Sequence, residues 1–330
     1  MTSSKLSIII PVFNVQNYLE PCIDSFHIQN KYKSTDVEII LIDDGSTDDS
    51  KKICDNFEAK YEIVKSIHIK KNSGQSVARN IGLEYATGNW IMYVDSDDIV
   101  RDGYIGWALS VINNVDLNDI VMFGLKPFES LDSIKNYSSL LRYNSSKMRV
   151  VTKDTAMYYL TTEKFGNYLC NKIFPRKVVE RVKLPKGQLY EDIATVYKYF
   201  EACNKVRLYE DVVYYYRQRS GSTVHLINPL DQYKSMIHAI KARLAQLTFF
   251  YNNDYYRAYN NAKYGLMLNS MSLIRVTLKN RFQKTSEFYE AKSFLKNYRC
   301  NLKRDGIKHY LFVKIYRMLP RFCEWLWQRM

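Results

Sequence analysis

The sequence predicts an α/β protein with a mostly parallel sheet flanked by helices, followed by a helical C-terminal region. Short apolar runs at 6–10, 37–42 and 90–94 are typical of strands that are buried on both faces of a parallel sheet. Amphipathic helical patterns separate these runs, as in successive β-α-β units. From Pro229 onward the apolar spacing is helical throughout. We therefore expect a domain of residues 1–228 and a basic helical region of residues 229–330.

The positive charge of the chain is concentrated in its C-terminal part. The protein has 330 residues and a net charge of +14, and residues 201–330 alone hold 23 Lys and Arg against 9 Asp and Glu. Residues 1–200 are balanced, with 25 basic and 25 acidic residues. This distribution indicates a balanced catalytic domain joined to a segment that meets an anionic surface.

Cysteine usage and hydropathy favour a cytoplasmic location. The six cysteines are scattered, with no short spacing that would indicate a zinc site or a disulfide framework. The first apolar run is short and contains Pro11, so no secretory signal is indicated. No apolar run approaches the roughly 20 residues of a spanning helix. Peripheral contact with the inner face of the membrane is left open.

The first strand, residues 6–10, ends in the turn Pro11-Val12-Phe13-Asn14, and a helix is expected from about 15 to 26. Pro11 stops the hydrogen-bond ladder because it has no N–H. The turn therefore lies at the carboxyl end of a strand, where a base or ribose could lie. An ordinary connecting loop explains the same residues.

The second strand, 37–42, leads into an acidic turn, Asp43-Asp44-Gly45-Ser46-Thr47-Asp48. Ser46 is a candidate helix N-cap, and acidic residues in the first helical turn favour the helix dipole. Capping explains Ser46, Asp48 and Asp49 without any ligand. It does not explain Asp43 and Asp44, which precede the turn.

A third strand, 64–69, is followed by a helix over 75–86 that carries Arg79 and Asn80 near its start. Arg79 could pair with a phosphate or a base, and it could equally hold one of the nearby aspartates.

The fourth strand, 89–94, ends in Asp95-Ser96-Asp97-Asp98. Because the carboxyl ends of parallel strands meet at one edge of a sheet, we expect this cluster to lie near Asp43 and Asp44. Like charges brought together are costly unless a cation lies between them, and a divalent cation carrying a diphosphate is the natural candidate. An Asp-x-Asp pair alone is a weak signal, because acidic loops are common.

The remaining elements of the first domain place two further candidate groups. Glu191 and Asp192 open a helix, where they either complement its dipole or supply a general base. The loop 218–228 carries Arg219 and His225, which suit a closing phosphate lid and also suit any exposed loop. The expected elements are a helix at 103–113, a strand at 119–124, a loop at 126–144, a helix at 154–161, a strand at 170–174, a helix at 193–202 and a strand at 212–217.

Four C-terminal helices are expected at 231–251, 255–279, 287–298 and 307–327, and the last of them is amphipathic. Pro320 should kink it. A basic amphipathic helix with terminal Trp residues suits an anionic bilayer surface, and a helix packed on the domain with a solvated basic face explains it equally. Its apolar face consists of Ile307, Leu311, Ile315, Met318, Leu319, Phe322 and Leu326, with Lys314, Arg317, Arg321 and Gln328 opposite.

Taken together, these motifs resemble a family-2 glycosyltransferase of the bacterial surface-polysaccharide type, over about residues 5–225. The family has the GT-A fold, a Rossmann-like and mostly parallel sheet flanked by helices. The resemblance rests on segments in a fixed order: Ser7–Asn14, Ile42–Asp48, Asn72–Gly74, Ala78–Gly82, Val94–Asp98, Tyr190–Asp192, and Tyr216-Arg217 with Gly221-Ser222.

The resemblance implies a role for individual residues. Asp192 would be the catalytic base, with Glu191 oriented toward the acceptor or the metal. Asp44 would accept from the uracil N–H, and Asp97 would be the most direct metal ligand. The other implied residues are Pro11, Val12 and Asn14 around the nucleotide, Arg79 near the base or diphosphate, Asp95 and Ser96 in the Asp-x-Asp element, Arg219 in the closing loop, and His225 as a third metal ligand with Asp95 and Asp97.

The resemblance further implies an enzyme that transfers a hexosyl or N-acetylhexosaminyl group with inversion. The donor would be a UDP-sugar, the cofactor Mn²⁺ or Mg²⁺, and the acceptor a lipid-linked or other oligosaccharide in exopolysaccharide or capsule synthesis. One alternative, a sugar-nucleotide nucleotidyltransferase, calls for a Gly-rich basic loop after the first strand, which residues 11–14 are not. A second alternative, a basic nucleic-acid-binding protein, leaves the acidic clusters unexplained, so we expect no nucleic-acid partner.

Overall fold

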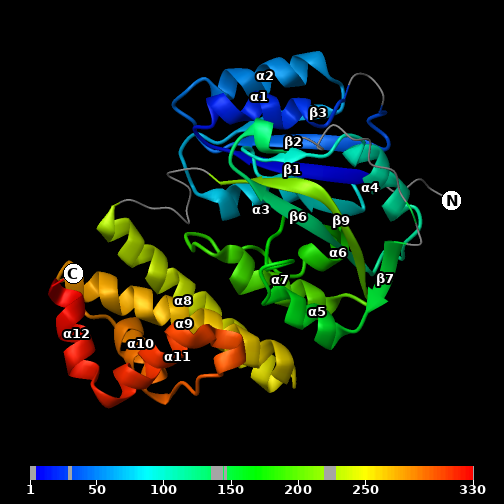
Figure 1. The fold of residues 1–330 in the computed structure, drawn as a ribbon. Helices are drawn as coiled ribbons and strands as arrows, with labels where there is room; N and C mark the ends of the chain where they lie inside the picture. The colour runs from blue at the N-terminus through cyan, green and yellow to red at the C-terminus, as the bar shows by residue number, and fades with distance from the viewer. Residues whose placement is uncertain (1–4, 29–31, 135–143, 145–146, 219–227, 330) are drawn as a thin grey trace. The chain divides into compact units, whose positions relative to one another are not determined.

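The computed structural model describes residues 5–28, 32–134, 144, 147–218 and 228–329 (Figure 1). The chain divides into two compact units, the first ending at Gln218 and the second beginning at Arg219. We describe each unit by itself.

Four parallel strands form the first half of the sheet in unit 1. β1 (Leu6–Val12) lies between β2 (Val37–Asp43) and β4 (Trp90–Tyr93), and β3 (Val64–His68) lies beyond β2. The pairs β1–β2, β1–β4 and β2–β3 are all parallel, so these strands end at the same edge of the sheet. The register places Val12 opposite Asp43, which brings the turn after β1 beside the acidic turn after β2.

The second half of the sheet is mixed. β8 (Lys172–Pro175) lies between β4 and β6 (Ile120–Phe128) and is antiparallel to both. β9 (Val206–Arg217) runs parallel to β6. The short strands β5 (Ile99–Val100) and β7 (Met148–Val151) are antiparallel to β9.

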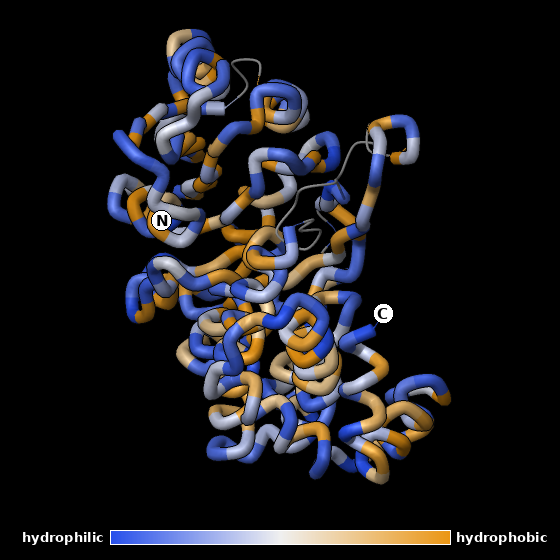
Figure 2. The backbone as a smooth tube through the Cα atoms, turned by 90° about the vertical axis from the view of Figure 1, so that its left-hand side faces the viewer, coloured by the Kyte–Doolittle hydropathy of each residue, from blue (hydrophilic) through white to orange (hydrophobic). Residues whose placement is uncertain are grey.

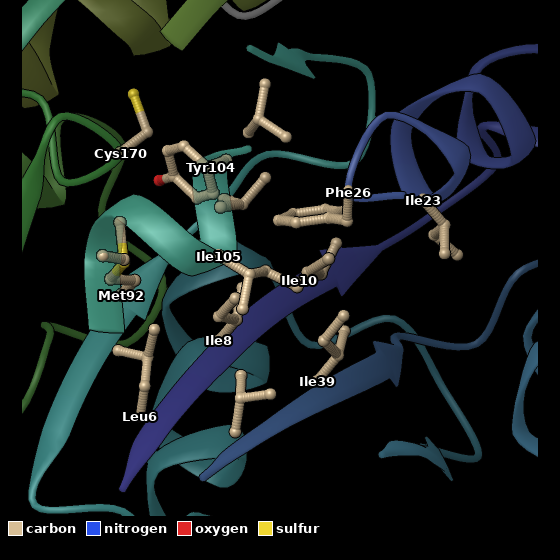
Figure 3. Packing of buried hydrophobic residues seen from close by; sticks show 14 of the residues in the cluster. Leu6, Ile8, Ile10, Ile23, Phe26, Ile39, Met92, Tyr104, Ile105 and Cys170 are labelled. Atoms are coloured by element: carbon tan, nitrogen blue, oxygen red, sulfur yellow. The ribbon is translucent and has the colours of Figure 1, made fainter. Parts of the chain in front are cut away.

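The helices of unit 1 cover both faces of the sheet. On one face, Leu6, Ile8 and Ile10 of β1 pack with residues of the helices α1 (Gln16–Asp24) and α4 (Tyr104–Ile112), including Ile23 and Tyr104 (Figure 3). Figure 2 shows hydrophobic residues, in orange, along the central strands. The helices are α1 (Gln16–Asp24), α2 (Ser50–Lys60), α3 (Gln75–Tyr85), α4 (Tyr104–Ile112), α5 (Lys153–Leu160), α6 (Arg176–Val179) and α7 (Glu191–Ala202), with a 3-10 turn at Leu131–Ser133.

Helix α3 packs on the opposite face through Gly82. A Cβ atom at Gly82 would lie 2.4 Å from Ile9 Cγ2 in β1 and 3.3 Å from Ile42 Cγ1 in β2. Any larger residue would push the helix away from the two strands. This close approach fixes α3, which carries Arg79 and Asn80, against the parallel half of the sheet.

One local prediction about unit 1 was wrong, and two predicted strands are present with shifted boundaries. Ser46 is not an N-cap, because α2 begins at Ser50 and its N-cap residue is Asp49. Ser46 Oγ instead accepts a hydrogen bond from the backbone N–H of Asn14, at 3.1 Å. The strand predicted at 170–174 runs over Lys172–Pro175, and β6 extends to Phe128, into the predicted loop.

Unit 2 is helical in its described part. Asn301 caps α11, since its side chain accepts from the N–H groups of Lys303 and Arg304. Pro320 does not kink one long helix, because α11 ends at Met318 and Pro320 begins α12. Among the described residues, no helix has both the length and the apolar composition needed to cross a bilayer. The helices are α8 (Pro229–Asn252), α9 (Tyr256–Lys279), α10 (Ser286–Asn297), α11 (Leu302–Met318) and α12 (Pro320–Arg329).

Candidate active site

The turns after β1 and β2 are joined by hydrogen bonds. Asn14 has a positive φ of 50°, and its side-chain oxygen accepts from the backbone N–H of Thr47 at 2.8 Å. The N–H of Asp44 donates to the carbonyl of Val12, at 2.8 Å. Pro11 lies opposite Ile42 in the same ladder. The structure therefore brings the predicted nucleotide-binding residues Pro11, Val12, Asn14 and Asp44 together at the carboxyl edge of the sheet.

The carboxylate of Asp44 holds the start of α3. Its two oxygens accept from the backbone N–H groups of Ser73, at 2.9 Å, and Gly74, at 2.7 Å. Asp43 is also buried, and its carboxylate contacts His68 Nδ1 and the N–H of Ser46, both at 3.0 Å. Each oxygen of a carboxylate has a second lone pair. Contact of Asp44 with a uracil thus stays a prediction.

Arg79 joins two acidic motifs that are far apart in the sequence. One guanidinium nitrogen donates to Asp95 Oδ1 at 2.6 Å, and another donates to the carboxylate of Glu191. Burial opposes the charge of Arg79, but the two carboxylates outweigh it and hold its pKa above the ordinary value. Of the two roles that the sequence left open, the structure has Arg79 holding an aspartate, and its contact with a nucleotide stays a prediction.

The Asp-x-Asp turn after β4 has two partly exposed carboxylates, Asp95 and Asp97, and two buried residues, Ser96 and Asp98. Asp95 Oδ1 accepts a second hydrogen bond, from Gln75 Nε2 at 3.2 Å. The first turn of α3 and the end of β4 are therefore connected through Asp95.

Asp98, which the sequence analysis did not assign to the site, fixes the end of β9. Its carboxylate accepts from the hydroxyl of Tyr214 at 2.5 Å and from the backbone N–H of Arg217 at 2.6 Å. Burial, followed by the nearby charges of Asp95 and Asp97, raises the pKa of Asp98 well above its ordinary value. The signal available in the sequence was a third carboxylate directly after Asp97.

Arg217 holds the backbone of the Asp-x-Asp turn. Its Nε donates to the carbonyl oxygen of Asp97 at 2.6 Å, and its guanidinium lies over the rings of Tyr18 and Phe128, 5.2 and 4.5 Å from their centroids. Cation–π contacts of this kind keep an arginine side chain in one orientation. Arg217 thereby positions Asp97.

Glu191 and Asp192 begin α7, and the loop before them is anchored to α3. The side-chain amide of Asn80 donates to the carbonyl of Leu184 at 2.9 Å and accepts from its N–H at 3.1 Å. Tyr190, directly before the helix, has a positive φ of 61°. The two acidic residues are half-buried, and Arg79 ties Glu191 to the end of β4.

The donor atoms at this edge suit a hard divalent cation. Ligand atoms of Asp95, Asp98 and Cys170 lie within 4.8 Å of one another. Burial raises the pKa of Cys170, so its thiol stays protonated, and Asp98 already accepts two hydrogen bonds. Mn²⁺ and Mg²⁺ prefer carboxylate oxygens, which Asp95 offers here, and ligation of a cation by Asp95 and Asp97 stays a prediction. The predicted residues Arg219 and His225 lie outside the described residues.

Known proteins share this chain's sequence pattern and fold. The glycosyl transferase family 2 model matches residues 7–183. The chain is 26% identical over 252 residues to the glycosyltransferase GlyG of Streptococcus pneumoniae serotype 4, covering 74% of this chain and 80% of that protein. It is 27% identical to the minor teichoic acid biosynthesis protein GgaB of Bacillus subtilis, covering 66% of this chain and only 23% of that protein.

Solved structures with the GT-A fold have the same architecture. S. aureus TarS 1-349 in complex with UDP-GlcNAc matches with a TM-score of 0.58 and 19% identity, covering 95% of this chain and 92% of that chain. The mannosyltransferase PcManGT from Pyrobaculum calidifontis, in complex with GDP-Man and Mn²⁺, matches with a TM-score of 0.55 and 12% identity, covering 96% of this chain and 88% of that chain. The predicted fold class is confirmed. Because the family model matches more than half of the chain, the protein belongs to glycosyl transferase family 2 and is a glycosyltransferase.

Proposed function

We propose that this glycosyltransferase moves a sugar, with inversion, from a UDP-sugar to a hydroxyl group of a surface glycan. One observation carries the proposal. Arg79, almost fully buried, binds Asp95 at the end of β4 and Glu191 at the start of α7, two residues that the chain separates by 96 positions. This contact supports a single cleft that has the donor site on one side and the catalytic base on the other.

The donor would bind at the carboxyl ends of β1, β2 and β4. Pro11, Val12, Asn14 and Asp44 would surround the base and ribose, and Asp44 retains lone pairs for the uracil N–H. The TarS complexes with UDP-GlcNAc and UDP favour a uridine nucleotide. The complex of PcManGT with GDP-Man makes a guanosine nucleotide the alternative to test.

Asp97, with Asp95, would hold the divalent cation, which supplies positive charge beside the departing diphosphate. Arg217 supports this assignment because it fixes the backbone carbonyl of Asp97. Ser96, Arg219 and His225 belong to the same proposal, the first as a donor contact and the other two as part of a closing loop.

Asp192 would act as the general base. The acceptor hydroxyl loses its proton to the Asp192 carboxylate while its oxygen attacks the anomeric carbon. The bond from that carbon to the diphosphate oxygen breaks on the opposite face, and its electron pair leaves with the diphosphate. Because Glu191 is bound by Arg79, it would serve to position its neighbour and the acceptor.

The acceptor would be a growing glycan, most simply one carried on a lipid. Relatives include proteins named for minor teichoic acid biosynthesis and for poly(glycerol phosphate) polymerisation, which supports an acceptor among the cell-surface polymers.

The test combines the variant Asp192→Asn with its matched control Asp154→Asn, which alters an exposed acidic residue in the first turn of α5. We expect Asp192→Asn to lower the rate of transfer by about 10²- to 10⁴-fold, the usual contribution of a general base. Both variants should keep the thermal stabilisation that a UDP-sugar and Mn²⁺ give together. Near-normal transfer by Asp192→Asn would refute the base assignment. Stabilisation by GDP-sugars alone would refute the donor assignment.

A further inference from the structure

Helices α11 and α12 carry an exposed apolar stripe that continues from one helix into the next. Met318 is 80% exposed, and Leu326, at 39%, is the least exposed member. Soluble proteins rarely expose large contiguous apolar patches, and the patches that they do expose commonly mark interaction sites. The stripe comprises Ile307, Leu311, Ile315, Met318, Leu319, Phe322, Trp325 and Leu326.

A different face of the same two helices packs inside unit 2. Val313, Tyr316 and Cys323 are buried, and the ring of Trp327 lies 5.9 Å from that of Tyr316. Glu324 accepts from the hydroxyl of Tyr316 at 2.9 Å and pairs with Lys292 of α10. The interior of the unit is therefore complete without the stripe. Helices α11 and α12 therefore pack in unit 2, but through a face other than the apolar face that the sequence identified.

The exposed charges on this segment are all of one sign. In the described residues 302–329, the two acidic residues are the buried Asp305 and the paired Glu324. At about 100° per residue, Lys308 and Lys314 lie about 60° to either side of Leu311, so Lys314 flanks the stripe and the prediction that it lies opposite the apolar face was wrong. In that position long basic side chains extend past an apolar stripe. The exposed basic residues are Lys303, Lys308, Lys314, Arg317, Arg321 and Arg329.

We propose that the exposed face of α11 and α12 is a docking surface for an anionic lipid membrane, lying in the interface with the stripe among the acyl chains. An apolar stripe with basic flanks and Trp at the end is the combination that binds such an interface. A second copy of the chain fits less well. A symmetric dimer through this face would bring Lys308 and Lys314 of one copy toward those of the other, with no exposed acidic partner in the described residues 302–329.

The proposal is independent of the chemistry proposed above. It concerns residues of unit 2 alone, and its readout contains neither nucleotide nor acceptor. Failure of Asp192 as a base would leave it intact.

Co-sedimentation of the full chain with vesicles tests the surface. We expect binding to vesicles of phosphatidylglycerol and phosphatidylcholine, much weaker binding to phosphatidylcholine alone, and loss of binding as salt rises. The variant Leu311→Ser with Ile315→Ser removes two exposed side chains of the stripe and should abolish most of the binding. Its matched control, Leu230→Ser with Tyr289→Ser, removes two exposed apolar side chains elsewhere in unit 2 and should bind as the wild type does.

A second pair of variants tests the charge. Replacing Lys308, Lys314 and Arg317 by Gln should weaken binding to the anionic vesicles about fivefold per residue. Replacing the exposed Lys234, Lys279 and Lys296 by Gln changes the net charge equally and should have a much smaller effect. Equal binding to both kinds of vesicle, or equal effects of the two triple variants, would overturn the proposal. So would a lipid-free dimer that Leu311→Ser with Ile315→Ser converts to monomer, since the stripe would then join two copies.

Discussion

The contact of Arg79 with Asp95 and Glu191 predicts a large stability effect for one substitution, Arg79→Met. Methionine keeps the length and most of the apolar volume of the arginine stem but removes the charge. The Arg79 side chain is 4% exposed, while Asp95 and Glu191 are 23% and 13% exposed. Without the guanidinium, two carboxylates with little access to water lose the positive charge that both of them contact. Removal of one partner from a buried ion pair costs about 3–5 kcal/mol.

The measurement is equilibrium urea unfolding of the full chain, with Lys183→Met as the matched control. Lys183 pairs with Glu84 at 2.8 Å, but these side chains are 66% and 58% exposed. Solvent screens such a pair, so its loss should cost at most about 1 kcal/mol. The difference between the two variants isolates the effect of burial from the effect of losing one basic residue.

A triple variant separates unpaired charge from lost packing. Arg79→Met combined with Asp95→Asn and Glu191→Gln leaves neither carboxylate without its cationic partner, so it should recover much of the stability that Arg79→Met loses. The reasoning is refuted if Arg79→Met costs no more than Lys183→Met, or if the triple variant is no more stable than Arg79→Met.

Two further predictions concern the sheet. Gly82→Ala should destabilise the protein by about 1–3 kcal/mol in urea unfolding, because the new methyl group overlaps Ile9; Gly106→Ala in α4, whose Cβ meets nothing closer than 3.5 Å, should be neutral or stabilising, and equal effects would contradict the packing argument. Burial opposes the charge of Glu38, but hydrogen bonds from Ser7 and Thr87 outweigh it and lower its pKa to about 2 from an ordinary 4.5. Its stabilising contribution is therefore complete above about pH 4.5 and is lost as the pH falls toward 2, so Glu38→Gln should flatten the acid limb of a stability–pH curve, and an unchanged slope would exclude Glu38 as its source.

The parallel half of the sheet could be predicted from the sequence because a strand that is buried on both faces consists of a continuous run of apolar residues. The strands at Leu6–Val12 and Val37–Asp43 consist mostly of apolar residues, and polar turns follow at once, Asn14 after the first and Asp43-Asp44 at the end of the second. The rule that parallel strands end at one edge then brings Asn14, Asp44 and Asp95 near one another without any coordinates.

The partners of the site residues could not be predicted, because they come from distant segments. The neighbouring sequence does not indicate that Arg79 donates a hydrogen bond to Glu191. Nor does it indicate that Ser46 accepts from the N–H of Asn14 instead of capping α2. The extent of β9 was missed for the same reason. Its first residues from Val206 pair with β6, and this pairing depends on tertiary contacts.

The sequence also could not predict which face of the last helices packs inside unit 2. A wheel identifies an apolar face but does not say whether that face turns inward. Here aromatic and small apolar residues on another side, such as Val313 and Tyr316, make the internal contacts. The prolonged helix predicted over 307–327 ignored that a proline is well accommodated at the first position of a new helix, as Pro320 is.

The two hydrogen bonds that Asp44 accepts at the start of α3 have a practical consequence for mutagenesis. Its carboxylate receives the backbone N–H groups of Ser73 and Gly74, so an alanine variant would release the entry to α3 whether or not a nucleotide is present. Weakened affinity in such a variant would therefore mix a lost ligand contact with a displaced helix. Two measurements would separate the lost ligand contact from the displaced helix. One is calorimetric titration of the wild type and the variant with UDP at matched folded fraction, and the other is titration of the wild type with a donor analogue methylated at the uracil nitrogen.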